Sequence, residues 1–246
     1  MSVAEKMTAL ADAIRSKTGG TEKLSIDQMT ADVTALQVGG SGDGLAKALI
    51  EKTVSEVNIE DVEVIGDSAF AGCTNLVTAD FPACTSVGSN AFSNCSSLTT
   101  VNIPACTSIG ASAFKSCTSL TMANFSVCTS VDSNAFNGCT NLTTVNFPVC
   151  TNIGTNVFTN CTNLTTASFP ACTSIGAWAF FGCASLVTAD FPACTNIVYS
   201  AFVSCTSLTT ANFPVCTSIG ASAFKSCTSL TLTLNNSLHF HLIRLI

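Results

Sequence analysis

Fifteen cysteines are the residues of this chain with the clearest capacity for chemistry, because thiolates bind metals, form disulfides and carry redox reactions. Each cysteine follows the one before it by 11 residues, and none lies outside that series. They therefore form two alternating columns, each with a period of 22 residues. The first column is Cys84, Cys106, Cys128, Cys150, Cys172, Cys194 and Cys216. The second is Cys73, Cys95, Cys117, Cys139, Cys161, Cys183, Cys205 and Cys227.

Three interpretations of these columns are open: buried core thiols, disulfides, or an intracellular metal-thiolate protein. The core interpretation is favoured, because cysteine behaves as a small hydrophobic residue. Val62 occupies a cysteine position in the first repeat, the number of cysteines is odd, and no C-x-x-C pair of zinc-site type occurs. For a core position without a hydrogen-bond partner, we expect Cys150→Ser to destabilise more than Cys150→Ala.

The other candidate ligands are two histidines and an acidic run near the first repeat. His239 and His241 share one face of a predicted strand, but no third ligand accompanies them, so surface histidines are the favoured interpretation. The acidic run, which could hold a cation, more simply solvates an open end of the array; it is Glu56, Glu60, Asp61, Glu63 and Asp67. We predict no catalytic residue, metal site or cofactor, and no enzyme activity, since no nucleophile, phosphate-binding or dinucleotide motif is present.

The elements that position the cysteines follow from the same 22-residue period. Phenylalanines recur at Phe70, Phe92, Phe114, Phe136, Phe158, Phe180, Phe202 and Phe224, and leucine and isoleucine or valine columns accompany them. One repeat, from Leu98 to Ile109, follows the frame L-x-x-L-x-L-x-x-C-x-x-I of a leucine-rich repeat. We therefore predict an α/β-type repeat solenoid with one short parallel strand per turn, whose apolar positions stack on those of neighbouring turns.

The segment I-P…S-I-G-x-x-A-F-x-x-C-x-x-L resembles the BspA-like leucine-rich repeat, over roughly residues 54 to 230. The chain departs from that family's usual pattern by being one residue shorter per repeat and by carrying cysteine where an aliphatic residue is expected. The resemblance implies a leucine-rich repeat fold and adhesion to a cell surface or host protein.

A neutral polar surface is the second consequence of the repeat. From Phe70 to Ser229 the only charged residues are Asp80, Lys115, Asp132, Asp190 and Lys225. Strand alternation should turn a column of threonines and a column of asparagines outward. The binding-face candidates are Thr100, Asn102, Asn124, Thr144, Asn146, Thr166, Ser168, Thr188, Asp190, Thr210 and Asn212. Such a face suits carbohydrate or protein recognition, though the same residues also suit plain solvent-facing positions.

The ends differ from the repeats and define three parts of the chain. Residues 1–44 are predicted to form an N-terminal helical module for attachment or oligomerisation, with a Gly-rich linker at 39–44. Residues 45–229 form the solenoid, of which 45–75 are a degenerate cap repeat, and 230–246 form a C-terminal β-hairpin cap. The oligomer candidates are the apolar residues Val3, Met7, Leu10, Ile14, Leu238, Phe240 and Leu242. The string from Leu10 to Ser25 resembles a short N-terminal segment of bacteriophage and prophage structural proteins.

Net charge and hydropathy limit the partners. With nine Lys and Arg against fifteen Asp and Glu, nucleic acid is not an expected partner. No apolar stretch is long enough to span a membrane as a helix, and no signal peptide is recognisable, so we expect cytoplasmic synthesis, with association with a virion or release by lysis. The function predicted is a non-enzymatic structural or adhesive protein, such as a phage tail fibre, a receptor-binding protein or a cell-surface adhesin, that self-associates and binds host protein or carbohydrate. The alternatives are a self-assembling fibre, an ice- or surface-binding solenoid, and the metal-thiolate protein.

Overall fold

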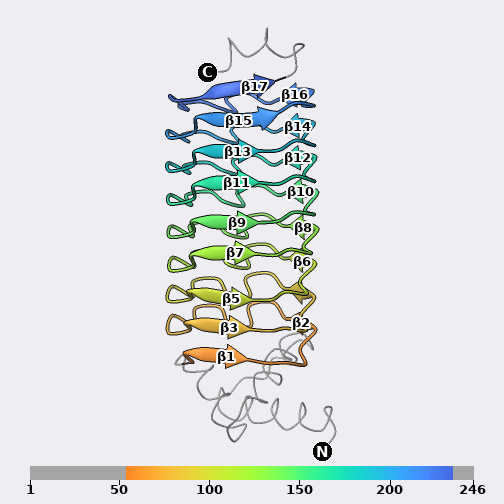
Figure 1. The fold of residues 1–246 in the computed structure, drawn as a ribbon. Coiled ribbons are helices and arrows are strands. Elements are labelled where there is room, and N and C mark those ends of the chain that lie inside the picture. Colours follow the sequence, from red (N-terminus) through yellow and green to blue (C-terminus); the bar gives the residue numbers. More distant parts are fainter. Residues whose placement is uncertain (1–53, 235–246) are drawn as a thin grey trace, which may run out of the picture.

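The computed structural model describes residues 54–234, which form a continuous coil of stacked turns (Figure 1). Every strand in this coil pairs in parallel with an equivalent strand of at least one neighbouring turn, mostly at an offset of 22 residues. The predicted parallel repeat solenoid is therefore confirmed. No helix occurs within residues 54–234, and accordingly none there is long and apolar enough to cross a membrane.

Each turn contains two strands, where the sequence pattern predicted one. A longer strand carries the outward threonine and asparagine positions, and a two-residue strand follows the first cysteine column. The longer strands are β1 (Glu56–Asn58), β3 (Thr78–Asp80), β5 (Thr100–Asn102), β7 (Met122–Asn124), β9 (Thr144–Asn146), β11 (Thr166–Ser168), β13 (Thr188–Asp190), β15 (Thr210–Phe213) and β17 (Thr231–Leu234). The short ones are β2 (Val64–Ile65), β4 (Ser86–Val87), β6 (Ser108–Ile109), β8 (Ser130–Val131), β10 (Asn152–Ile153), β12 (Ser174–Ile175), β14 (Asn196–Ile197) and β16 (Ser218–Ile219).

The two strand series build sheets on different sides of the coil (Figure 1). The even-numbered strands form one continuous eight-stranded sheet from β2 to β16. The odd-numbered strands form a three-stranded sheet, β1-β3-β5, and a six-stranded sheet, β7 to β17. The odd-numbered face is thus interrupted between β5 and β7, whereas the even-numbered face is not.

The third side of each turn is made of tight turns that are also hydrogen-bonded from one repeat to the next. Phe70 N, for example, donates to Ala91 O at 2.7 Å, and Phe92 N donates to Ala113 O at 2.7 Å. Two positions per turn on this side have a positive φ, at Ser68 and Gly72 and their equivalents. Residues in these two columns are Gly, Asn or Ser, which tolerate or favour that conformation, with the exception of Trp178.

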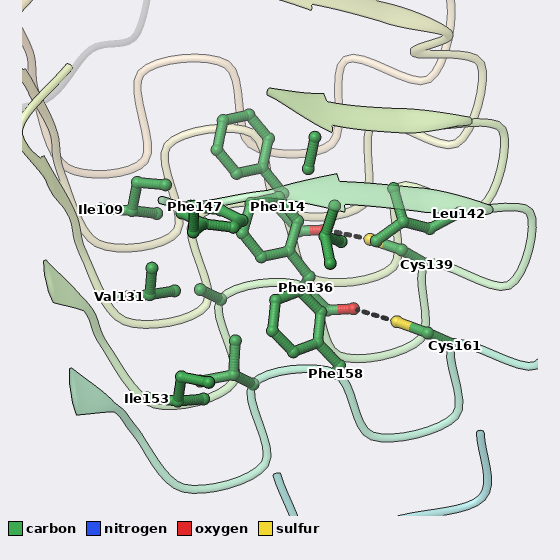
Figure 2. Packing of buried hydrophobic residues seen from close by; sticks show 14 of the residues in the cluster. Ile109, Phe114, Val131, Phe136, Cys139, Leu142, Phe147, Ile153, Phe158 and Cys161 are labelled. Carbon is green, nitrogen blue, oxygen red and sulfur yellow. Dashed lines mark hydrogen bonds between the residues drawn. The ribbon is translucent and has the colours of Figure 1, made fainter. Parts of the chain in front are cut away.

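Stacked phenylalanines fill the interior (Figure 2). Phe114, Phe136 and Phe158 are fully buried and lie in parallel, with ring centroids 5.2 Å and 5.5 Å apart. A second phenylalanine column, including Phe147, packs edge-on against the first at 6.0 Å from Phe136. Because each ring packs on its equivalents, the core extends along the whole coil without a unique centre.

The last strand shows a one-residue change in register. β17 pairs with β15 at an offset of 21, so that Ala211 is level with Leu232 and Phe213 with Leu234. An offset of 22 would have placed Thr233 level with Ala211 and Asn235 level with Phe213, and a slip of one residue exchanges the two faces of a strand. The strand expected at the start of the C-terminal hairpin is therefore present as the final rung of the solenoid. Its partner arm and the N-terminal module at 1–44 lie outside residues 54–234.

Candidate binding surfaces

The cysteine columns lie in the core, as buried thiols. In the first column each thiol lies beside the backbone carbonyl oxygen two residues later; Cys150 Sγ donates to Asn152 O at 3.2 Å. In the second column each thiol from Cys95 to Cys227 reaches a phenylalanine carbonyl 25 residues earlier, and Cys161 Sγ donates to Phe136 O at 3.2 Å (Figure 2). The slots are therefore shaped for a small side chain that also donates a weak hydrogen bond.

Burial favours the protonated form of most of these thiols, whereas a hydrogen bond with Cys205 lowers the pKa of Cys227. Loss of hydration, reinforced by neighbouring cysteines, raises the pKa of Cys106 and of Cys172 to about 12. Burial also raises the pKa of Cys139 to about 12. Thiolate is the form that binds metals, and no group of three or more His, Cys, Asp or Glu side chains in residues 54–234 is arranged to hold a metal ion. This environment suits packing and not metal or redox chemistry.

The hydrogen bond of Cys150 overturns one expectation from the sequence. A serine hydroxyl at this position would not be left without an acceptor, because Asn152 O already receives the thiol hydrogen. The sequence pattern could not show this, since it identifies only which side chains face inward. The premise of the expected order of stability, a slot without a hydrogen-bond partner, is therefore wrong for Cys150.

The outward face of the odd-numbered strands carries the predicted threonine and asparagine columns. All eleven binding-face candidates are exposed or half-exposed, while the residue between them in each strand is buried or nearly so. Neighbouring side chains of the asparagine column hydrogen-bond to one another. Asn146 Nδ2 donates to Asn124 Oδ1 at 2.8 Å, and Asn212 Nδ2 donates to Asp190 Oδ1 at 2.8 Å. A third such pair joins Asn102 Nδ2 to Asp80 Oδ1 at 2.7 Å.

This face is not a uniform threonine array. Met122 stands in the threonine column with more than half of its surface exposed, beside the interruption between β5 and β7. Asp190, with Asp80 at the equivalent position, adds charge to the asparagine column. A surface that matches an ice lattice needs an uninterrupted repeat, so nothing here favours the ice-binding alternative.

A further threonine column escaped the sequence analysis. It follows the first cysteine column from Thr85 to Thr217, and each hydroxyl donates to the carbonyl oxygen of the equivalent residue one turn earlier. Thr107 Oγ1, for example, donates to Thr85 O at 3.0 Å. These hydroxyls link neighbouring turns by hydrogen bonds between the two strands of each turn. The sequence indicated this column, because its threonines recur every 22 residues.

Two further features, a groove and a pair of aromatic rings, were not predicted from the sequence. A groove of about 430 Å³ runs along β4 to β10, and the exposed rings of Trp178 and Tyr199 meet edge-on at 4.8 Å. The chain contains one Trp and one Tyr, 21 residues apart, which is one residue less than a turn. Because residues about one turn apart lie on neighbouring turns, this spacing could have predicted that the two rings lie close together.

The remaining predicted sites lie outside residues 54–234. These are His239 and His241, and the oligomer candidates at both ends of the chain, Val3, Met7, Leu10, Ile14, Leu238, Phe240 and Leu242. The acidic residues of the first repeat are within the described part. Glu60, Asp61, Glu63 and Asp67 are exposed, in keeping with a solvated first turn.

The coil, its period and its inward columns define a leucine-rich repeat protein. The model of the BspA type leucine-rich repeat region matches residues 46–165 and 129–240 of the chain. The protein belongs to this family, as its repeat motif indicated. The match begins after residues 1–44 and lends no support to the phage-like interpretation of that segment.

Solved structures similar to the chain are also leucine-rich repeat proteins. A leucine-rich cell surface protein from Faecalibacterium prausnitzii is 26% identical, with a TM-score of 0.45, over 71% of this chain and 64% of its own. The chain thus spans less than two thirds of that protein. A leucine-rich repeat protein of T. pallidum is 22% identical, with a TM-score of 0.47, over 78% of this chain and 83% of its own. No curated protein matches.

Proposed function

We propose that the protein is a non-enzymatic adhesin that binds a protein or carbohydrate of a cell surface through the outward face of β5 to β15. The observation that carries this proposal is the row of exposed, uncharged hydrogen-bonding side chains repeated on consecutive strands. Many weak, equivalent contacts on a rigid face suit attachment to an extended surface. They do not suit catalysis, which needs a unique constellation of groups.

Membership of the BspA-type family supports a binding function, and one similar structure is described as a cell surface protein. The scarcity of charged residues on this face supports a ligand that carries little charge. From β5 to β15 the outward strand positions carry a single charged side chain, Asp190, so long-range electrostatic steering contributes little.

Attachment to a cell surface can be tested by measuring retention of the labelled full-length protein on cultured epithelial cells and on bacterial cells. Thr144→Arg combined with Thr166→Arg places two cations on adjacent strands of the proposed face and should reduce retention at least ten-fold. Val149→Arg, at an exposed position between the two sheets, is the matched control and should bind like the unaltered protein. Equal retention of both variants, or a strong loss of binding in high salt, would contradict the proposal.

The narrower predictions stay predictions. A tail-fibre or receptor-binding function on a virion, cytoplasmic synthesis and release by lysis all depend on the N-terminal residues 1–44. Homo-oligomer or fibre formation depends on those residues and on the last strand of the predicted hairpin. None of these segments lies within residues 54–234, and the family match lends them no support.

A further inference from the structure

The side of the coil formed by the even-numbered strands carries a groove that has no part in the proposed adhesive face. Outward polar side chains of the short strands form one wall, and glycines of the following column leave backbone exposed at the floor. Its lining includes Ser108, Ser130, Asn152, Gly88, Gly110 and Gly154. Neighbouring turns approach closely here, because a Cβ atom at Gly110 would lie 2.8 Å from the backbone of Gly88. Glycine at these positions therefore lets neighbouring turns pack closely along the groove.

The groove is longer than a single small molecule would need. It reaches from Asp67 to Gly154, which is about four turns, or roughly 20 Å at about 4.8 Å per strand. Two carboxylates, Asp67 and Asp132, are among its lining residues. Each uses one oxygen to accept a backbone N–H, from Ser89 at 2.6 Å and from Ser133 at 2.7 Å. The second oxygen of each carboxylate has further capacity to accept hydrogen bonds.

Tyr199 lies in a column that lines the groove, further along the coil, and Trp178 lies in the next column, that of Ser68. Val198 and Tyr199 occupy, in their turn, the positions that Gly88 and Ser89 occupy in the groove. At about 4.8 Å per turn, they follow Gly154 by roughly 10 Å. Tyr199 therefore stands in line with the groove, beyond its C-terminal end, and Trp178 contacts it from the neighbouring column.

Trp178 is held there in an unusual conformation. Its φ is +53°, in a column where seven other turns have Ser or Asn. A positive φ raises the conformational energy of a bulky residue. The fold does not require a bulky residue here, because Ser or Asn occupies this position in the other turns. Trp178 is nevertheless 37% exposed and Tyr199 46% exposed, so the pair is not explained by core packing.

From these two observations we propose that the groove and the Trp178–Tyr199 pair together bind an extended, uncharged oligosaccharide. Sugar hydroxyls match the serine, asparagine and carboxylate groups of the groove. The C–H face of a sugar ring matches an exposed aromatic ring, whose face carries partial negative charge. Neither of the two cations in residues 54–234, Lys115 and Lys225, lines the groove, so an anionic chain is not favoured. A peptide strand finds no edge there, because β4 to β14 are paired on both sides.

Trp178 is the single tryptophan of the chain, so its fluorescence reports directly on the site. The full-length protein is titrated with neutral hexasaccharides of glucose, xylose, mannose and N-acetylglucosamine, by fluorescence and by calorimetry. At least one hexasaccharide should shift the emission and release heat at millimolar concentration or below, and it should bind much more tightly than its monosaccharide. Absence of any response from all four overturns the proposal.

Single substitutions test the contributions of the aromatic pair and of the groove separately. Trp178→Asn and Tyr199→Ala install residues that the same columns carry in other turns, so the fold should be kept. Each should weaken binding at least ten-fold by calorimetry. Ser130→Arg fills the groove and leaves Trp178 in place, and it should also weaken binding ten-fold. If Ser130→Arg binds normally, the aromatic pair acts without the groove and the proposal is wrong.

The control distinguishes this site from the proposed adhesive face. Met122→Thr removes an exposed apolar side chain on the odd-numbered strands and should leave hexasaccharide affinity unchanged. The Thr144→Arg, Thr166→Arg protein should likewise bind the sugar normally while losing cell retention. Loss of sugar binding in either protein would contradict a separate site.

Discussion

The thiol of Cys150 lies 3.2 Å from the carbonyl oxygen of Asn152, to which it donates a hydrogen bond. The same contact recurs at Cys106 with Ser108 and at Cys172 with Ser174, also at 3.2 Å. Each cysteine of this column thus fills a small apolar space and satisfies a carbonyl of the short strand that follows it.

The contact predicts how Cys150 tolerates substitution. Cys150→Ser should cost no more free energy of unfolding than Cys150→Ala, because the hydroxyl keeps a donor for Asn152 O while alanine loses the bond and leaves a void. Each should cost about 1–2 kcal/mol. Cys150→Val is the informative third variant, since Val62 occupies the equivalent slot of the first repeat. Urea denaturation measures all three, and a serine variant clearly less stable than the alanine variant would contradict the assigned bond.

Thiol labelling should distinguish the folded from the unfolded protein. All fifteen cysteines are buried, so a thiol reagent at neutral pH should modify few groups in the native protein and about fifteen after denaturation. Mass spectrometry of the alkylated protein gives the number directly. Rapid labelling of most cysteines in the native state, or a mass deficit from bridges, would show that the core is open or oxidised.

Alkaline pH should destabilise the protein through the same thiols. Burial raises the pKa of Cys106 and Cys128 from 9.0 to about 12. A raised native pKa contributes stability that is present in full below the unfolded pKa and is lost as pH rises through the native pKa. The free energy of unfolding should therefore fall as pH rises from about 9 towards about 12. Denaturation curves at increasing pH measure the decline.

The matched control for this pH effect is a protein with Cys106→Val and Cys128→Val. Removing two of the titrating thiols should make the decline of stability with pH shallower, whatever the stability at neutral pH. An unchanged slope would assign the alkaline effect to other groups.

The phenylalanine stack should control cooperativity as well as stability. Phe136→Ala removes a fully buried ring between Phe114 and Phe158 and should cost about 3–5 kcal/mol. Because turns contact only their neighbours, the two flanking blocks of repeats should then unfold more independently, with a broader urea transition. Met122→Ala, at an exposed position, should change the midpoint little. A sharp transition for Phe136→Ala would show coupling beyond neighbouring turns.

Assembly is predicted from the apolar residues at the ends of the chain. The full-length protein should be a homo-oligomer by light scattering at micromolar concentration, since an uncovered terminal strand pairs readily with another chain. Phe240→Glu with Leu242→Glu should reduce its mass if the C-terminal segment is the contact. A monomeric full-length protein would refute the prediction.

The period of the sequence determined most of the fold. Because a solenoid places residues 22 apart directly above one another, the columns of Phe, Leu, Ile and Cys predicted the core, and the interleaved Thr and Asn positions predicted the exposed face. Leu98, Ile103, Cys106, Ile109, Phe114 and Cys117 are all buried as predicted, and Val101 is half-buried. Alternation along a strand is local, so it can be read without knowing how the turns pack.

The tertiary structure decided what those columns touch. Whether a thiol meets a carbonyl depends on the path of the backbone between columns, as the 25-residue step from Phe136 to Cys161 shows. The second strand of each turn, the one-residue slip of β17 and the groove depend on how neighbouring turns approach each other. The meeting of Trp178 and Tyr199 depends on the pitch of the coil, which brings residues 21 apart into contact. Composition and spacing fix which residues face inward, but contacts between columns exist only once the coil has closed.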